Sequence, residues 1–321
     1  MQLRELGEFA LIDQIAREAQ RDATSAGAVR LGIGDDAALL RPNASEEVAI
    51  SVDASVEGVH FELGVMTPRR IGAHALIAAL SDLAAMGARP LGALLSLAAP
   101  AKSDAHSIRG ILRGAVRTGS DHRCPVVGGN LTRAREISLH VTVVGAVRRG
   151  RALVRSKAKP DQRVLVTGRL GEAALADARR ARASAGSRAR VPLPQPRIEA
   201  GRRLTRISGV GACIDLSDGL ASDLRHVLAA SGVGAEIDLA TLPRRRGFDR
   251  ACRALGLAPE AALVGFGEDY ELLFTATRRA PSAAAFAKTL GLPVTEIGII
   301  TKKGLRWRNG DVPRDAGWRH F

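Results

Sequence analysis

Residues 71–87 constrain the fold more than any other stretch, because nearly every side chain in this run is apolar or small. Thr67 and Pro68 provide a helix start, and Gly87 followed by Pro90 provides a helix end. A helix that is apolar on every side is buried in a core. The chain must therefore supply enough other apolar structure to surround this helix.

Asp82 lies within this apolar helix, and no Lys or Arg stands within one turn of it. A buried carboxylate without a partner is costly enough to become neutral. We therefore expect a partner from elsewhere in the chain. An ion pair with a distant arginine and a hydrogen bond from a backbone N–H are the plain alternatives to a bound cation.

Length and composition predict two cytoplasmic domains. The 321 residues correspond to about two domains of 150 residues each, and a hydrophobic content of 46% is ample for their cores. No apolar run is long enough for a membrane span, and Met1–Ala10 has no apolar signal core. The three cysteines are odd in number and widely spaced, which predicts reduced thiols rather than disulfides or a zinc site.

The formal net charge of +14 raises the alternative of a nucleic-acid partner. Aromatic residues make up only 3% of the chain, and Tyr270 is the single tyrosine, so stacking platforms for bases are nearly absent. Much of the positive charge is arginine in alanine-rich stretches such as residues 179–190. We interpret it as a solvated surface, or as attraction for phosphorylated substrates, and predict no nucleic-acid partner.

Hydrophobic periodicity predicts mixed α/β sheets in two domains, with a boundary near Val147–Arg151. We expect residues 1–149 to form one domain and residues 150–321 the other. In the first we expect helices at 9–19, 71–87 and 107–118 and strands at 37–40, 47–55, 91–98, 124–127 and 137–147. In the second we expect helices at 171–182, from 197, and at 220–230, and strands at 163–167, 212–216, 235–239, one entered by 265–274, and 292–301, the last closing the sheet.

Acidic residues beside glycines or strand ends stand in segments that contain no Lys or Arg, although the chain is basic. Asp215 and Asp218 lie three apart at a predicted strand-to-helix turn, where both can face one point. Carboxylate oxygens are the ligands that Mg²⁺ shares with substrate phosphates. Taken singly, Asp218 could be a helix N-cap and Asp35 a turn residue, but together the acids favour a phosphate site with several metal ions.

Competing nucleotide motifs are absent or unsuitable. Residues 32–37 fit G-x-G-x-x-A, but two carboxylates would face the pyrophosphate and Pro42 leaves no room for the required helix. No G-x-x-x-x-G-K-[ST] loop occurs, and no Ser-His-Asp or Cys-His arrangement stands out. Any nucleotide phosphate must therefore be held through metal ions.

The acidic blocks, in order along essentially the whole chain, resemble thiamine-monophosphate kinase of the aminoimidazole ribonucleotide synthetase-like superfamily. The matching motifs are Gly32–Ala38, Ser51–Asp53 with Glu57–Phe61, Leu80–Ala88, Gly128–Gly129, Arg155–Ser156 with Lys159–Pro160, Ile214–Leu220, Gly267–Leu272 and Trp318–Phe321. The resemblance implies a two-domain α/β fold. Its N-terminal domain would bind ATP and magnesium and form a homodimer through its sheet, and its C-terminal domain would complete the active site.

The resemblance also implies an activity and its site residues. The activity is ATP-dependent phosphorylation of thiamine monophosphate to thiamine diphosphate, with several Mg²⁺ ions and ATP as co-substrate. The implied metal ligands are Asp36, Ser51, Val52, Asp53, Asp82, Asn130, Asp215 and Asp218. The implied ATP contacts are Asp36, Gly129, Asn130, Arg155 and Ser217, and the implied substrate contacts are His60, Glu268 and Trp318. No catalytic base is implied, since the attacking phosphate oxygen is already anionic.

Two positions depart from the family pattern. Val52 stands where the family usually has threonine, so only its backbone carbonyl could bind a metal, and Asn130 stands where it has aspartate. Two alternatives stay open beside the kinase. One is another ATP-using synthetase of the same superfamily, against which the Glu268 block and the tail favour the kinase. The other, which these departures motivate, is a catalytically impaired nucleotide-binding homologue.

Overall fold

The computed structural model describes Gln14, residues 29–31, 39–40, 42–182 and 192–310, and residues 312, 316 and 317. The predicted helix at residues 9–19 lies outside this part of the chain, except for Gln14. Asp36 and Trp318 also lie outside it. The expectations for these residues stay predictions.

The described chain divides into two compact units. Over the described residues, the first unit contains the chain up to Leu83, Arg89–Arg149 and residues 192–193. The second unit contains, again over the described residues, Ala84–Ala88, Gly150 to Ala183 and the chain from Pro194 onward. The roles that we expect for residues 1–149 and 150–321 stay proposals.

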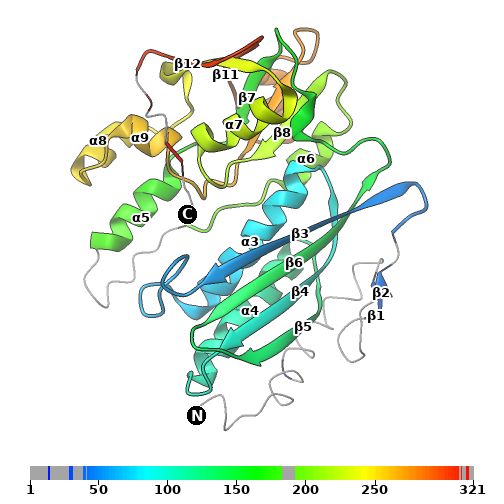
Figure 1. Ribbon diagram of the computed structural model, residues 1–321, viewed down its shortest axis with the longest axis vertical. Coiled ribbons are helices and arrows are strands. Elements are labelled where there is room, and N and C mark those ends of the chain that lie inside the picture. Colours follow the sequence, from blue (N-terminus) through cyan, green and yellow to red (C-terminus); the bar gives the residue numbers. More distant parts are fainter. Residues whose placement is uncertain are drawn as a thin grey trace. The chain divides into compact units, whose positions relative to one another are not determined.

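The first unit contains a four-stranded sheet in the order β3-β6-β4-β5 (Figure 1). Its strands are β3 (Glu46–Val56), β6 (Ser138–Arg148), β4 (Arg89–Ala99) and β5 (Val126–Arg133). β6 pairs antiparallel with both neighbours, and β4 pairs parallel with β5. The strand predicted at 124–127 begins two residues later and continues through Gly128-Gly129-Asn130. A separate two-stranded sheet joins β1 (Val29–Leu31) to β2 (Leu39–Leu40).

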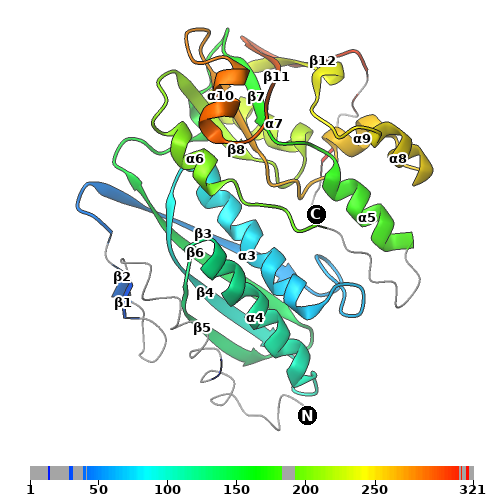
Figure 2. The same cartoon turned by 180° about the vertical axis from the view of Figure 1, so that it is seen from behind.

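Two helices cover one face of the four-stranded sheet (Figure 2). They are α3 (Pro68–Ala85), which is the predicted apolar helix, and α4 (Ala105–Asp121), whose N-cap is Asp104. Gly87 ends the first helix region with a left-handed φ of 67°. The other face of the sheet exposes large apolar side chains, with Val48 at 50%, Ile50 at 69% and Val52 at 65% of their surface exposed. The sheet therefore has one face packed in the core and one apolar face. Leu40 packs against part of the second face, beside Leu91 and Ala146, but the β3 side of that face stays exposed, and we call it the open face.

The second unit contains a six-stranded sheet in the order β12-β9-β11-β7-β10-β8. Its strands are β7 (Arg163–Thr167), β8 (Val210–Asp215), β9 (Gly234–Asp238), β10 (Leu272–Ala276), β11 (Val294–Thr301) and β12 (Leu305–Arg308). All neighbours pair antiparallel except β12 and β9. The expectation that residues 292–301 close the sheet is wrong, because β11 lies inside it and β12 forms the edge.

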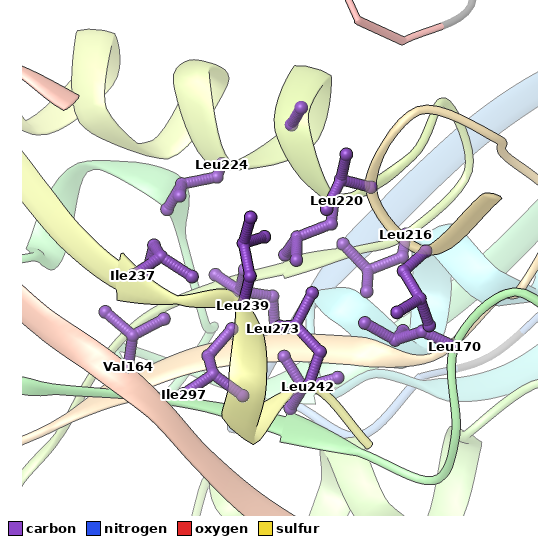
Figure 3. Packing of buried hydrophobic residues seen from close by; sticks show 14 of the residues in the cluster. Val164, Leu170, Leu216, Leu220, Leu224, Ile237, Leu239, Leu242, Leu273 and Ile297 are labelled. Carbon is purple, nitrogen blue, oxygen red and sulfur yellow. The ribbon is translucent and has the colours of Figure 1, made fainter. Parts of the chain in front are cut away.

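The helices of the second unit are partly those predicted. α5 (Glu172–Arg182), α6 (Ile198–Leu204) and α7 (Leu220–Ser231) lie close to the predicted ranges. α8 (Phe248–Ala254), α9 (Pro259–Val264) and α10 (Ala283–Leu290) are additional, as are the short 3₁₀ helices η1 (Arg155–Lys157) and η2 (Leu239–Thr241). Figure 3 shows the core, where Leu220 and Leu224 of α7 pack near Ile237, Leu273 and Ile297 of the sheet. Among the described residues, no helix combines the length and apolarity that a membrane crossing requires.

Candidate active site

Three predicted ligands of the first unit lie where β3 faces α3, on the covered side of the sheet. Ser51 and Asp53 alternate with exposed neighbours on β3, and the hydroxyl of Ser51 donates a hydrogen bond to the carboxylate of Asp82 on α3. We call Ser51, Asp53 and Asp82 the first acid group. A strand and a helix, both regular, hold its side chains.

The burial of Asp82 differs from what we expect from the sequence. This residue is half-buried rather than fully buried, and lies four residues after Ala78 and eight after His74, which are also half-buried. These positions form the one stripe of the central helix that keeps some exposed surface. A carboxylate that keeps part of its hydration does not require a cation as partner, and the hydroxyl of Ser51 is a sufficient hydrogen-bond donor.

Val52 and Asn130 lie on the opposite face of the same sheet. The side chain of Val52 alternates away from Ser51 and Asp53 and is 65% exposed. Asn130 pairs with Ser96, Ser96 pairs with His140, and His140 pairs with Ala54, which shares the face of Val52. Both departures from the family pattern therefore lie on the open face, away from the side chains of the first acid group.

Three other predicted site residues, Gly129, His60 and Arg155, lie in separate local environments. A Cβ atom at Gly129 would lie 2.0 Å from the carbonyl oxygen of Leu95, so only glycine allows this approach of the two parallel strands. His60 accepts a hydrogen bond at Nδ1 from the N–H of Val56 (3.2 Å), which assigns the proton of the neutral ring to Nε2. Arg155 lies exposed in η1 of the second unit, and its carbonyl accepts from the hydroxyl of Ser231 (2.8 Å).

The second unit places Asp215 and Asp218 at a strand-to-helix turn, as predicted. Asp215 is the last residue of β8 and only 2% exposed, while Asp218 is half-buried. The N-cap of α7 is Gly219, with φ of 105°, and no side chain caps that helix end. The plain alternative for Asp218, a helix N-cap, is therefore excluded.

Asp223 joins these two aspartates, although the sequence analysis did not single it out. It lies in the first turn of α7, is 2% exposed, and accepts a hydrogen bond from the N–H of Asp218 (3.1 Å). We call Asp215, Asp218 and Asp223 the second acid group. One ligand atom from each of Asp218, Asp223 and His226 lies within 4.8 Å of the other two.

Crowding of the second acid group has an electrostatic consequence. Burial, followed by the neighbouring charges of Asp215 and Asp218, raises the pKa of the Asp223 carboxyl to about 8, against two backbone N–H groups that lower it. The surroundings of the Asp223 carboxyl thus include two other negative charges, which repel its ionised form. A divalent cation would relieve this repulsion, so the donor set, which is mainly carboxylate oxygen, fits Mg²⁺.

Glu268 lies in a loop that pairs directly with the turn of the second acid group. The N–H of Glu268 donates to the carbonyl of Ser217 (2.9 Å), and the N–H of Tyr270 donates to the carbonyl of Leu216 (2.9 Å). A Cβ atom at Gly267 would lie 2.0 Å from the Ser217 carbonyl oxygen, so glycine permits this contact. The structure therefore brings together Asp215, Ser217, Asp218 and Glu268, four predicted residues from two distant stretches.

The chemistry available in each unit follows from these donor sets. Hard oxygen ligands suit divalent cations and phosphates. The i, i+3 spacing of Asp223 and His226 on one helix face was the signal that could have revealed both residues from the sequence.

Comparisons with known proteins identify the family of this chain. The family "AIR synthase related protein" matches with its N-terminal domain at residues 34–147 and with its C-terminal domain at residues 159–307. The chain is similar to thiamine-monophosphate kinase of Synechococcus elongatus, with 37% identity over 310 residues that cover 90% of this chain and 91% of that protein.

The chain is also similar to solved structures of thiamine-monophosphate kinases. The crystal structure of thiamine-monophosphate kinase from Stenotrophomonas maltophilia K279a is 35% identical, with a TM-score of 0.80, over 95% of this chain and 98% of that chain. The structure of AaThiL complexed with AMPPCP and TMP is 30% identical, with a TM-score of 0.74, over 100% and 99% of the two chains. The mixed α/β fold in two domains, which the sequence predicts, is thereby confirmed.

Proposed function

This chain belongs to the AIR synthase related proteins, and within them to the thiamine-monophosphate kinases, and we propose from this membership how its two acid groups serve the reaction. The protein is a kinase that transfers the γ-phosphate of ATP to thiamine monophosphate and so forms thiamine diphosphate. One observation carries the assignment. The relatives match over nearly the whole chain, and a homologue of the same fold is known in complex with AMPPCP and TMP.

The two acid groups are the proposed holders of Mg²⁺. Ser51, Asp53 and Asp82 supply one set of oxygen ligands, and Asp215, Asp218 and Asp223 supply the other. Asp36 belongs to the proposed ligands by resemblance, and Val52 and Asn130 stay weaker candidates. When bound, the ions supply positive charge that offsets the repulsion between two phosphate groups.

The remaining site residues hold and orient the two substrates. Arg155, Gly129, Asn130 and Ser217 are the proposed ATP contacts, and an exposed arginine suits a phosphate. His60, Glu268 and Trp318 are the proposed contacts of thiamine monophosphate. Because Nδ1 of His60 accepts from Val56, the neutral ring carries its proton on Nε2.

The chain's residues need not remove a proton from the acceptor. A phosphate monoester oxygen is anionic at neutral pH, so orientation of the acceptor toward the γ-phosphate is the main requirement. Rigid elements meet that requirement in the first unit, and a network of backbone hydrogen bonds meets it in the second.

We further propose that the open face of the first sheet pairs with that of a second copy in a homodimer. Val48, Ile50 and Val52 each expose half or more of their surface on β3, and Leu94 of β4 exposes 37%. A contiguous apolar face of this kind is costly in water and suits a two-fold symmetric contact. A cytoplasmic location stays a prediction.

The proposed function has a direct test. The purified protein is incubated with ATP, Mg²⁺ and thiamine monophosphate, and the products are separated by chromatography. Thiamine diphosphate should form with thiamine monophosphate as the acceptor, but not with unphosphorylated thiamine in its place. If thiamine monophosphate is recovered unchanged, the assignment is wrong for this chain.

A further inference from the structure

The loop that carries Glu268 has an unusual backbone. Glu268 has φ of 66° and Tyr270 has φ of 49°, and neither is a glycine. Left-handed conformations are unfavourable for residues that carry a side chain, so the surrounding structure must enforce them. Two such residues within three positions mark a segment whose shape depends on its anchors.

Backbone pairing supplies the first set of anchors. Glu268 and Tyr270 donate to the carbonyls of Ser217 and Leu216, each at 2.9 Å, and the N–H of Leu216 donates to the carbonyl of Glu271 (2.8 Å). These bonds extend the antiparallel pairing of β8 and β10, which begins at Asp215 and Leu272. They fix where the loop lies, but they leave the direction of each side chain to other contacts.

Asp269 supplies a second anchor, on another element. Its carboxylate accepts from the N–H of Gly171 (2.7 Å) and from the N–H of Ala173 (3.3 Å), at the start of α5. A helix is usually capped by the residue just before it, whereas Asp269 is 98 positions from Gly171. The cap therefore does more than end a helix, because it ties a distant loop to it.

Glu271 supplies the third anchor, two residues further along. It is 3% exposed, accepts from the hydroxyl of Thr167 (2.7 Å), and accepts from Nε of Arg197 (2.7 Å). Hydrogen bonds to the carboxyl groups of Asp269 and Glu271 thus hold the chain on both sides of Tyr270. Glu268 directly precedes Asp269 in the chain, so a shift of Asp269 would turn the backbone from which the Glu268 side chain extends.

We propose that Asp269 is a positioning residue, which sets the direction of Glu268 toward thiamine monophosphate by tying the loop at 267–271 to the N-terminus of α5. The inference rests on the proposed role of Glu268 in substrate binding. Asp269 itself touches no substrate. Its loss should weaken binding of the acceptor while leaving ATP binding and the transfer step nearly unchanged.

The test compares Asp269→Ala with Asp269→Asn and with Asp104→Ala. Asparagine retains an oxygen that can accept an N–H, so it should restore most of the function. Asp104→Ala removes another capping carboxylate, which accepts from His106 and Ser107 at the start of α4 in the first unit. It controls for a general loss of stability. Should the alanine variant fail to fold, Asp269→Glu displaces the carboxylate by one methylene and serves instead.

Two readouts decide the inference. For Asp269→Ala we expect the KM for thiamine monophosphate to rise about tenfold, while kcat and the KM for ATP change by less than about twofold. This pattern is expected when the lost interaction stabilises the bound substrate and the transition state equally. Hydrogen exchange of the peptide covering 265–271 should quicken in this variant. Neither readout should change in Asp104→Ala.

The outcomes separate the inference from the proposed function. Unchanged exchange at 265–271 overturns the anchoring role, and faster exchange with an unchanged KM overturns the link to the substrate. If the unmodified protein makes no thiamine diphosphate, the proposed function has failed, and the link to that substrate fails with it. The exchange comparison needs no substrate and still decides whether Asp269 holds the loop.

Discussion

The two acid groups are built on different kinds of backbone. Ser51, Asp53 and Asp82 lie in the middle of a strand and a helix, where periodic hydrogen bonding fixes each side chain. The second acid group lies at a strand end, in a turn and in a first helical turn, beside a loop with two left-handed residues. The first site is thus determined by local regularity, and the second by contacts between distant segments.

This difference indicates how each site should respond to change. A substitution in the first acid group removes a ligand without disturbing its supports, because strand and helix persist without it. A substitution around the second can move several functional groups together, since the loop and the turn share their hydrogen bonds. The predictions below test this contrast, from the largest expected effect to the smallest.

Asp82→Asn should lower turnover at least a hundredfold while leaving the metal-free fold intact. The change removes a proposed metal ligand but keeps an oxygen that can accept from Ser51. Product formation and the thermal midpoint in a chelator measure the two effects. Asp121→Asn, at the exposed end of α4, is the matched control. Near-normal turnover of Asp82→Asn, or collapse of its metal-free fold, would count against the first acid group as a metal site.

Ile50→Glu should convert the proposed homodimer into monomers. Ile50 is 69% exposed in the middle of the edge strand β3, on the open face, and an unpaired charge buried there in a dimer would cost several kcal/mol. Sedimentation at micromolar concentration measures the assembly. Glu47→Gln, at an exposed position near the start of the same strand, should leave the assembly unchanged. A monomer for the unmodified protein would remove the open face as a dimer contact.

The metal-free protein should lose stability as pH rises from about 4 to about 7, in part through Asp269. Burial raises the pKa of this carboxyl to about 7 from 3.8, against hydrogen bonds from Gly171 and Ala173 that lower it. Between these values the folded protein holds a proton that the unfolded chain has released, so raising the pH favours unfolding.

Asp269→Asn should flatten this dependence, by about 1–2 kcal/mol over the interval. Denaturant unfolding at pH 4.5 and pH 7.5, in a chelator, measures the change for both proteins. Equal slopes with pH would show that Asp269 ionises with an ordinary pKa. Asp104, whose pKa is lowered by its hydrogen bonds with Ser107, offers a control with the opposite direction of shift.

Val52→Thr should leave the Mg²⁺ concentration for half-maximal rate within about twofold. The resemblance to the family alone predicts that threonine here, with Asn130→Asp, lowers that requirement. The new hydroxyl would instead lie on the open face, away from Ser51 and Asp53. A Mg²⁺ titration of both single variants decides, and a clear shift for Val52→Thr would mean that the strand presents this position differently.

The parts that the sequence predicts well are those governed by local pattern. Alternation locates β3 and β6, the apolar run locates α3, and the Asp215–Asp218 spacing locates a strand-to-helix turn. Alternation along β3 also gives the face of Val52, but the face of Asn130 requires the register across four strands, which no local pattern contains. The cap that Asp269 provides joins residues 98 positions apart, so only the folded chain reveals it.

Transfer of labelled phosphate tests the central claim most directly. With ATP labelled in the γ-phosphate, Mg²⁺ and thiamine monophosphate, we expect one label in thiamine diphosphate for each ADP formed. Thiamine diphosphate should stay unlabelled when Mg²⁺ is removed by a chelator. Label that appears instead in inorganic phosphate, at the rate of ADP formation, would contradict the kinase and favour an ATP-using synthetase.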